Sequence, residues 1–297
     1  MIEVCNVTKC FGEFKALDEL NMTVPTGTVY GLVGPNGAGK STIIRHITGI
    51  YRQDSGTITV DGAPVYENPA VKGRIAYISD DVFYFNTASI RDMAKFYAGV
   101  YPNFSWERFN ALQDAFALDQ KRPIRRFSKG MQKQAAFWLC MAMQPEILVL
   151  DEPVDGLDPV MRRQVWSIIM ADIAERGTTV LVSSHNLREL EDVCDHVGIM
   201  DHGKILLERS LSEMQENICK VLVALPDGGT LPAGLNIVHQ SSTGRLLTLI
   251  LRGNQDEIAG ALYTAQPLFM DMVPLTLEEI FIYELGGVDY AVKDIIL

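Results

Sequence analysis

The chain repeats short apolar runs separated by stretches with helical spacing. Runs of four or five largely apolar residues occur at four places: 29–33, 147–150, 179–183 and 197–200. Such runs are typical of parallel strands that are buried on both faces of a sheet. Stretches with a helical period follow some of them, as expected when helices connect parallel strands. The hydrophobic pattern therefore predicts an α/β core.

Two further regions differ from this core. Residues 2–7 have a strand pattern, and further strands are predicted up to Pro25 and over 56–62, which indicates an antiparallel N-terminal β subdomain. Aromatic residues become dense after Val82 and recur with helical spacing, so we predict a helical insertion over about 82–143. Most of these rings are expected to form the core of the insertion itself.

The pattern changes after residue 215. Three strands and then two helices are predicted there, at 219–225, 235–239, 246–251, 256–264 and 277–285. Each helix follows a capping residue that has a glutamate three positions later. We therefore divide the chain into a large domain over 1–215 and a small α+β accessory domain over 216–297. The accessory domain carries no cluster of catalytic residue types, and a packing or regulatory role is expected.

Composition narrows the class of protein. The 297 residues are 47% hydrophobic, which is ample for a packed core, and a net charge of −11 argues against a protein that coats nucleic acid. The five cysteines show no C-x-x-C pairing, which predicts reduced thiols in a cytosolic protein and no zinc site. No signal peptide is recognised, and the longest apolar stretch, 135–143, is too short to span a membrane. Any membrane association is therefore expected to come through a partner.

One stretch of nine residues carries a chemical signature. Residues 34–42 match the phosphate-loop pattern G-x-x-x-x-G-K-[ST] in full, between a predicted strand and a predicted helix. Its glycines let backbone N–H groups approach phosphate oxygens closely. Lys40 would place its charge on the β and γ phosphates, and Ser41 would offer its hydroxyl to Mg²⁺. The predicted nucleotide-binding residues of this stretch are Gly34, Asn36, Gly37, Ala38, Gly39, Lys40, Ser41 and Thr42.

Polar residues follow two of the buried strands. Asp151 and Glu152 come directly after one of them, and His185 follows another. Ligands bind at the carboxyl edge of open α/β sheets, so these side chains are predicted beside the phosphate loop. A single histidine is more often structural, but this position favours a role in the chemistry. Phe11, just before a glycine turn, is predicted either to stack on an adenine ring or to lie in the core.

With these residues and further motifs, the chain resembles the nucleotide-binding (ATPase) subunit of ABC transporters over roughly 1–215. It is most similar to bacterial single-domain ATPases, including the acetoin-utilisation-type subgroup. The ordered set is far more specific than any single motif. It consists of the aromatic Phe11, Walker A at 34–42, the signature at 127–131, Walker B at 147–152, the D-loop at 154–158 and the switch histidine His185. The resemblance implies a P-loop NTPase fold with a mixed sheet core.

The resemblance also implies how the residues act. Two such subunits pack head to tail, and each ATP is held between Walker A of one subunit and the signature residues Ser128 and Gly130 of the other. Asp151 would hold Mg²⁺ through water, Glu152 would accept the proton of the attacking water, and His185 would stabilise the γ-phosphate as it leaves. The catalytic residues would then be Glu152, His185 and the Walker A lysine.

The implied partners are a second ATPase subunit, either a copy of this chain or a relative, and separate transmembrane permease subunits. Through them the protein would lie in the cytoplasm, on the inner face of the cell membrane. No nucleic-acid partner is expected. Two alternatives stay open. One is a soluble ABC ATPase acting on ribosomes or DNA, a class that generally carries two nucleotide domains or a long coiled-coil insertion, and the other is a degenerate regulator that binds ATP without hydrolysing it.

The sequence departs from the family's pattern at two places, and both bear on how ATP hydrolysis is coupled to transport. The signature usually reads Leu-Ser-Gly-Gly-Gln, whereas Lys129 and Met131 here replace one glycine and the glutamine. Lys129 either adds positive charge near the partner's nucleotide or points into solvent. Asp80 stands where the family has the glutamine of the Q-loop. Because a carboxylate can ligate Mg²⁺, Asp80 joins Ser41 and Asp151 as a predicted metal ligand.

The segment 81–101 is predicted to contact the membrane subunits, because in the family a short helix of the membrane subunit enters beside the helical insertion. The segment contains Phe83, Tyr84 and Phe85, and a strand pattern would expose at least one of these rings. In the alternative interpretation, all three rings fill the core of the insertion.

Overall fold

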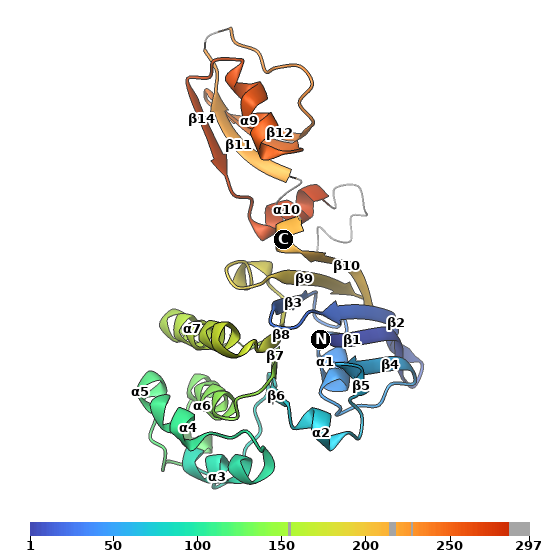
Figure 1. Ribbon diagram of the computed structural model, residues 1–297, viewed down its shortest axis with the longest axis vertical. Coiled ribbons are helices and arrows are strands. Elements are labelled where there is room, and N and C mark those ends of the chain that lie inside the picture. The colour runs from blue at the N-terminus through green and yellow to red at the C-terminus, as the bar shows by residue number, and fades with distance from the viewer. Residues whose placement is uncertain (154–155, 214–217, 227, 285–297) are drawn as a thin grey trace. The chain divides into compact units, whose positions relative to one another are not determined.

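The computed structural model describes residues 1–153, 156–213, 218–226 and 228–284 of the chain (Figure 1). The chain folds as two compact units. The first contains residues 1–185 and 193–208, and the second contains residues 186–192 together with the chain from 209 onward. The short segment 186–192, which the sequence placed in the large domain, therefore packs with the C-terminal unit. Two residues of the D-loop motif, 154 and 155, lie outside the described residues.

The first unit is built on a six-stranded sheet with the strand order β10-β9-β3-β8-β7-β6. Its strands are β3 Val29–Val33, β6 Ile75–Ile78, β7 Ile147–Asp151, β8 Thr179–Ser184, β9 His196–Asp201 and β10 Lys204–Ser210. Five of these strands are parallel to one another: β9, β3, β8, β7 and β6. Of these, β3, β7 and β8 are buried over their whole length. The predicted parallel core is confirmed, since strands covered on both faces need no polar alternation.

A second, antiparallel sheet has the strand order β2-β1-β4-β5. Its strands are β1 Ile2–Phe11, β2 Phe14–Val24, β4 Ser55–Val60 and β5 Ala63–Pro64. Helix α1, Lys40–Ile47, packs Ile43 and Ile44 into one apolar cluster that includes Leu17 of β2 and Leu181 of β8. The helix that begins at the phosphate loop is thus held between the two sheets.

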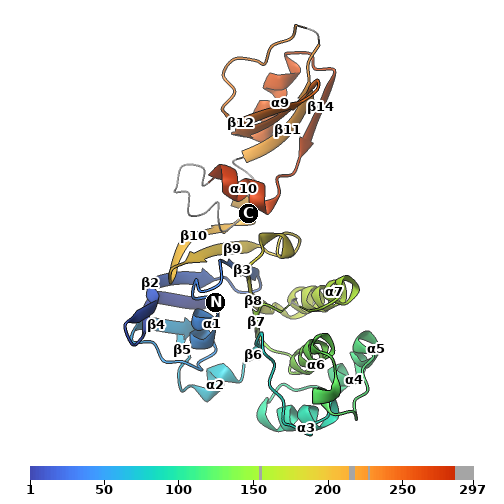
Figure 2. The same cartoon turned by 180° about the vertical axis from the view of Figure 1, so that it is seen from behind.

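The other side of the six-stranded sheet is covered by helices (Figures 1 and 2). In both views α6 and α7 lie on one side of β7 and β8, and α1 lies on the opposite side. These helices and their neighbours are α3 Ile90–Val100, α4 Trp106–Ala111, α5 Gln113–Phe116, η1 Ile124–Arg126, α6 Lys129–Ala142 and α7 Pro159–Arg176. Phe109 stacks on Trp138 with ring centroids 4.9 Å apart, and the Trp138 Nε1–H donates to the Phe109 carbonyl at 2.7 Å. The expectation that most aromatic residues of the insertion form its core holds for fewer than half of them, since the buried ones are Tyr84, Phe109, Phe116, Phe127, Phe137 and Trp138.

The described residues of the second unit include an antiparallel sheet of order β12-β13-β11-β14, with helices beside it in the sequence. The elements are η2 Leu187–Glu189, β11 Ile218–Ala224, β12 Ile237–Thr243, β13 Leu246–Arg252, α9 Gln255–Tyr263, β14 Phe269–Val273 and α10 Leu277–Glu284. The capping box predicted for the last helix is present, with the Thr276 hydroxyl accepting from the Glu279 N–H at 3.1 Å. Arg188 of η2 pairs with Glu278 of α10 at 2.9 Å, which explains why segment 186–192 belongs to this unit.

Three details of the sequence prediction need correction. Helix α2, Pro69–Lys72, and strand β14 were not predicted, and β12 lies at 237–243 instead of 235–239. β12 is exposed along its whole length, so its hydrophobic pattern carries little information about where it begins. Within the described part of the chain, every helix is too short or too polar to cross a membrane.

Candidate active site

The phosphate loop connects β3 to α1, and its glycines are required by geometry. Gly37 and Gly39 have φ angles of 86° and 108°, which L side chains rarely adopt. A Cβ on Gly34 would lie 2.1 Å from the Met200 carbonyl oxygen at the end of β9. The loop therefore turns tightly before the N-terminus of α1, where the helix dipole favours an anion.

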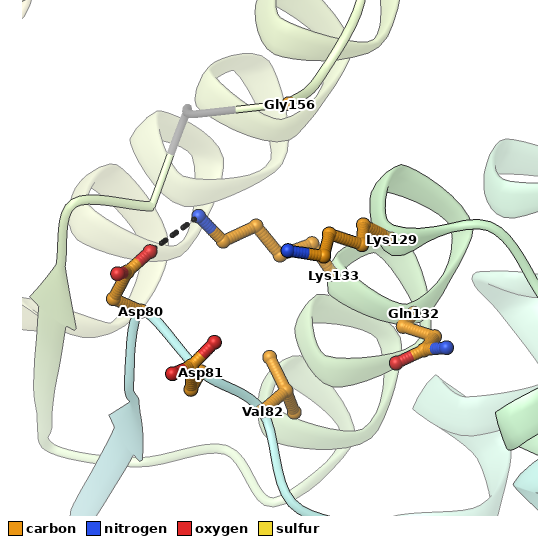
Figure 3. A pocket seen from close by; sticks show the side chains of 7 residues that line it. All are labelled: Asp80, Asp81, Val82, Lys129, Gln132, Lys133 and Gly156. Carbon is orange, nitrogen blue, oxygen red and sulfur yellow. Dashed lines mark hydrogen bonds and ion pairs between the residues drawn. The ribbon is translucent and has the colours of Figure 1, made fainter.

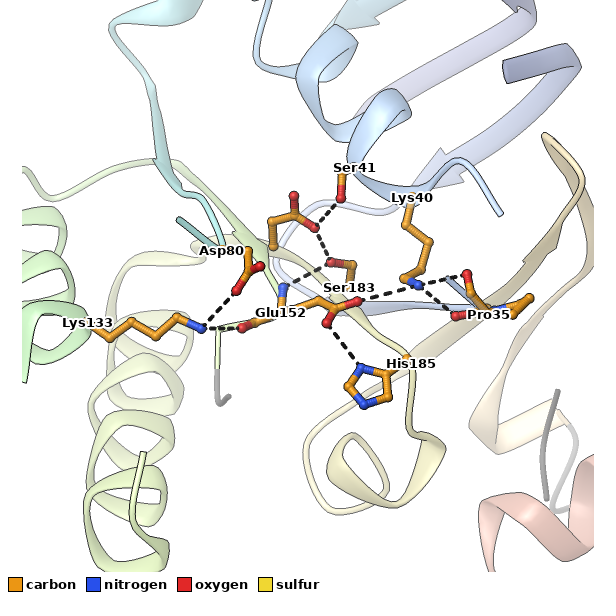
Figure 4. A network of polar contacts seen from close by, with 10 residues as sticks. Pro35, Lys40, Ser41, Asp80, Lys133, Glu152, Ser183 and His185 are labelled. Carbon is orange, nitrogen blue, oxygen red and sulfur yellow. Dashed lines mark hydrogen bonds and ion pairs between the residues drawn. The ribbon is translucent and has the colours of Figure 1, made fainter. Parts of the chain in front are cut away.

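Lys40 is the first residue of α1, and only 5% of its side chain is exposed. Its Nζ donates to the carbonyls of Gly34 and Pro35 at 2.6 and 3.2 Å, and it lies 3.5 Å from a Glu152 oxygen (Figure 4). Burial lowers the pKa of Lys40, and the nearby Glu152 carboxylate partly counteracts this effect. The ammonium group is thus folded over the loop, within reach of any phosphate that the loop holds.

Ser41, Asp151 and Ser183 form a second set of contacts at the same edge. The Ser41 hydroxyl donates to Asp151 Oδ1 at 3.1 Å, and the buried Ser183 hydroxyl donates to the same oxygen at 2.7 Å. Asp151 is itself almost fully buried. A serine hydroxyl beside a carboxylate is the oxygen pair from which Mg²⁺ is held in phosphate-loop proteins.

Glu152 lies at the centre of the network. Its carboxylate is 3.1 Å from His185 Nδ1 on one side and 3.5 Å from Lys40 Nζ on the other. The Glu152 backbone has a φ of 46°, an uncommon conformation for a residue with a Cβ. Its N–H donates to the Ser183 hydroxyl at 3.1 Å. The structure thus brings together the three residues that were predicted to be catalytic.

The arrangement fits ATP with Mg²⁺. Mg²⁺ keeps several waters and usually takes one or two carboxylates together with substrate phosphates, so a full protein cage is not needed. No group of three or more His, Cys, Asp or Glu side chains suited to a metal is found among the described residues. Ser41 and Asp151 supply two oxygen donors beside the loop, and Lys40 supplies the positive charge for the phosphates.

Asp80 occupies a different place from the other predicted metal ligands. Its carboxylate faces Lys133 of α6 at 3.4 Å, and Lys133 Nζ also donates to the Glu152 carbonyl at 2.7 Å.

Sequence reasoning missed Lys133 and Ser183. Neither residue stands out in the sequence, because Lys133 lies between Gln132 and Gln134 and Ser183 is followed by Ser184. Asp80, Lys133 and the exposed Lys129 line a cavity of about 270 Å³, together with residues 81, 82, 132 and 156 (Figure 3).

The signature residues lie at the start of α6. Ser128 is the N-cap of this helix, as predicted, and its hydroxyl accepts from the Met131 N–H at 3.3 Å. A Cβ on Gly130 would lie 2.7 Å from the Gly156 carbonyl, so a larger residue cannot fit there. α6, which follows Ser128, and α1, which follows the phosphate loop, lie on opposite sides of the sheet in Figures 1 and 2.

The structure shows where the aromatic residues Phe11 and Phe83 to Phe85 lie. Phe11 is 46% exposed at the end of β1, and its ring meets Tyr51 edge to face with centroids 5.8 Å apart. Phe83 and Phe85 are 81% and 52% exposed, whereas Tyr84 is buried and its hydroxyl donates to the Gln132 carbonyl at 3.0 Å. The expectation that at least one of the three rings is exposed therefore agrees with the structure.

Comparisons with known proteins identify the relatives of this chain. A family model described as ABC transporter matches residues 17–155. The ABC transporter ATP-binding protein YtrB of Bacillus subtilis is 30% identical over 97% of this chain and 99% of its own length. The daunorubicin/doxorubicin resistance ATP-binding protein DrrA of Streptomyces peucetius is 35% identical over 73% of this chain and 67% of its own.

Solved structures agree with these sequence relatives. The structure of an ATP-binding subunit of an ABC transporter has a TM-score of 0.68 and 25% identity, covering 72% of this chain and 92% of its own. A dimeric bacterial ABC transporter cassette has a TM-score of 0.65 and 21% identity, and the match covers 71% of this chain and 99% of that one. This second likeness supports the fold.

Proposed function

Because the chain belongs to the ABC transporter family as one of its ATP-binding subunits, we propose a role in ATP hydrolysis for each residue of the network described above. The protein binds ATP and Mg²⁺, hydrolyses ATP in a dimer and works with separate membrane subunits. The observation that carries the assignment is the position of the Glu152 carboxylate between Lys40 and His185, beside the Ser41 and Asp151 pair.

In the proposed roles, the loop 34–39 and Lys40 bind the phosphates, and Ser41 and Asp151 hold Mg²⁺, which adds positive charge at the phosphate oxygens. Glu152 accepts the proton of the attacking water, and His185 orients the Glu152 carboxylate and contacts the γ-phosphate. Ser128 and Gly130 bind the nucleotide of the partner subunit, and Phe11 offers its ring to the adenine. Asp80 stays a predicted Mg²⁺ ligand whose carboxylate faces Lys133 in this structure.

The direct test of these roles is phosphate release from ATP by the purified chain, compared with the Glu152→Gln variant. Glutamine keeps the size of the side chain but cannot accept the proton, so turnover should fall by about 100-fold or more while ATP binding is retained. Turnover by Glu152→Gln at the parental rate would contradict the assignment. A variant that also fails to bind ATP would show that Glu152 acts in binding instead.

The surface for the membrane partner is proposed at an aromatic patch made of Phe83, Phe85 and Phe96. These three rings are each about half exposed or more, and Phe85 meets Phe83 and Phe96 edge to face, with ring centroids 6.5 and 5.5 Å apart. Clustered exposed aromatics are typical of interface anchors. With a permease on this patch, the protein lies in the cytoplasm against the inner face of the membrane.

Single alanine variants test this surface. Phe83→Ala should leave the melting temperature nearly unchanged and lose co-purification with the membrane subunits. Phe269→Ala, which removes an exposed ring in the C-terminal unit, is the matched control and should keep both properties. Tyr84→Ala should lower stability by about 3 kcal/mol, because it empties a buried site. Retention of the partner by Phe83→Ala and Phe85→Ala would place the contact elsewhere.

A further inference from the structure

A buried cation lies behind the proposed catalytic carboxylate. Lys133 is on the second turn of α6, its side chain is 7% exposed, and its Nζ reaches across to the end of β7. At the end of β7, Lys133 Nζ donates to the backbone carbonyl of Glu152 at 2.7 Å, and it also pairs with Asp80 Oδ1 at 3.4 Å. Figure 4 shows these contacts on the side of Glu152 away from His185.

Lys133 contacts the backbone at Glu152, whose conformation is uncommon for a residue with a Cβ. Glu152 has a φ of 46°, and such a conformation persists only where the surroundings hold it. Its N–H is held by the Ser183 hydroxyl at 3.1 Å, and its carbonyl is held by the Lys133 ammonium. Hydrogen bonds to a charged donor are about twice as strong as neutral ones. The two contacts therefore fix the peptide groups on both sides of the Glu152 Cα, from which the carboxylate projects.

The counter-charge comes from a third segment. A lysine that is removed from water needs a carboxylate partner, and Asp80, 62% exposed, supplies it from the end of β6. Lys133 also lies only five residues after Ser128 in the same helix. A displacement of α6, which follows the signature residue Ser128, would therefore change the Lys133 contact to the Glu152 backbone carbonyl.

We propose that Lys133 is a positioning residue for ATP hydrolysis, which holds Glu152 in its productive orientation and links it to the signature helix, with Asp80 as counter-ion. The inference rests on the proposed role of Glu152. In this role Lys133 acts through the Glu152 backbone and not through a contact with the nucleotide. It should therefore affect the rate of hydrolysis and leave the affinity for ATP largely as it is.

The test is the steady-state kinetics of Lys133→Met with ATP and Mg²⁺. Methionine keeps much of the buried side-chain volume but removes the donor and the charge. We expect kcat to fall about tenfold or more and KM for ATP to change less than about twofold. Lys133→Arg, which keeps a charged donor, should recover most of the rate. Lys72→Met is the matched control, since Lys72 donates to the Gly49 carbonyl at 2.8 Å outside the site, and it should keep the parental kcat.

A second measurement separates positioning from a purely structural role. In the Glu152→Gln background, Lys133→Met should lower the residual turnover by less than about twofold, because the carboxylate that Lys133 positions is already gone. A full tenfold loss in that background would overturn the inference. So would a parental kcat in Lys133→Met, or a loss expressed in KM alone. If Lys133→Met does not fold, Lys133→Gln is measured in its place, with the same expected loss of kcat.

The outcomes also distinguish this inference from the proposed function. A parental chain that hydrolyses ATP, with a Glu152→Gln variant that does not, supports the proposed function whatever Lys133→Met does. Only the comparison of Lys133→Met with Lys133→Arg and Lys72→Met then decides the role of Lys133.

Discussion

The Ser183 hydroxyl makes two contacts at once, donating to Asp151 Oδ1 at 2.7 Å and accepting from the Glu152 N–H at 3.1 Å. It is fully buried on β8, so neither partner can turn to bulk water if the hydroxyl is removed. One side chain thus couples the proposed Mg²⁺ ligand to the proposed proton acceptor.

Ser183→Ala should therefore affect both stability and turnover. Leaving a buried donor and a carboxylate oxygen without this partner should cost about 1–3 kcal/mol of unfolding free energy. Turnover should fall, with a higher Mg²⁺ concentration needed for half-maximal rate. Thr178→Val removes a buried hydroxyl that contacts the Pro145 carbonyl, and this control should lose stability while keeping its turnover. An unchanged Mg²⁺ dependence in Ser183→Ala would contradict the coupling.

At this scale the sequence predicted the residues that local patterns identify. The phosphate loop and the polar residues after two buried strands are contiguous signals, and the strand order then brings them together. Ser183 and Lys133 could not be assigned from the sequence, because their partners Asp151 and Glu152 lie 32 and 19 positions away in the chain. Their contacts depend on how β7, β8 and α6 pack, which a single sequence does not specify.

At the scale of elements, an ion-pair cluster joins the helical insertion to α7. Asp172 of α7 is 1% exposed and pairs with Arg108 of α4 at 2.5 Å and with Arg176 at 2.6 Å. Burial raises the pKa of Asp172, and the two guanidinium groups oppose that shift. The cluster thus fixes α4 against α7 through charges that are largely removed from water.

Asp172→Asn should loosen this junction. Removing the carboxylate leaves two arginines, each 26% exposed, without their counter-charge, and unfolding free energy should fall by about 2–3 kcal/mol. Asp61→Asn is the control, because Asp61 pairs with Arg74 on the surface, where such pairs contribute about 0–1 kcal/mol. Denaturant unfolding of both variants makes the comparison, and equal losses would show that the buried cluster does not stabilise the junction.

The elements predicted well are those with a strong period or a wholly apolar run. Those missed have neither: α2 is a single turn, and β14, Phe269–Val273, alternates methionines with an aspartate at the edge of its sheet. For α2 a local signal was present in Asn68 before Pro69, since Asn68 caps the helix and proline favours its first position.

At the scale of the whole molecule, the proposed roles divide one chain into two half-sites. The phosphate loop and α1 lie on one side of the six-stranded sheet, and Ser128 and Gly130 lie with α6 on the other. In the proposed roles, these signature residues bind the ATP of the partner subunit and not that of their own chain. A second subunit that brings its signature to the bound ATP would then complete the site, so nucleotide that binds only in the dimer would drive association by mass action.

The measurement that tests this account most directly is the mass of the Glu152→Gln protein in solution, by light scattering, with and without ATP and Mg²⁺. Without nucleotide we expect the 33.0 kDa of one chain. With saturating ATP and Mg²⁺ we expect about twice that mass, because hydrolysis no longer releases the dimer. Adding Lys40→Ala to the same protein should abolish the ATP-dependent increase. A Glu152→Gln protein that binds ATP and stays at the mass of one chain would contradict a homodimeric site.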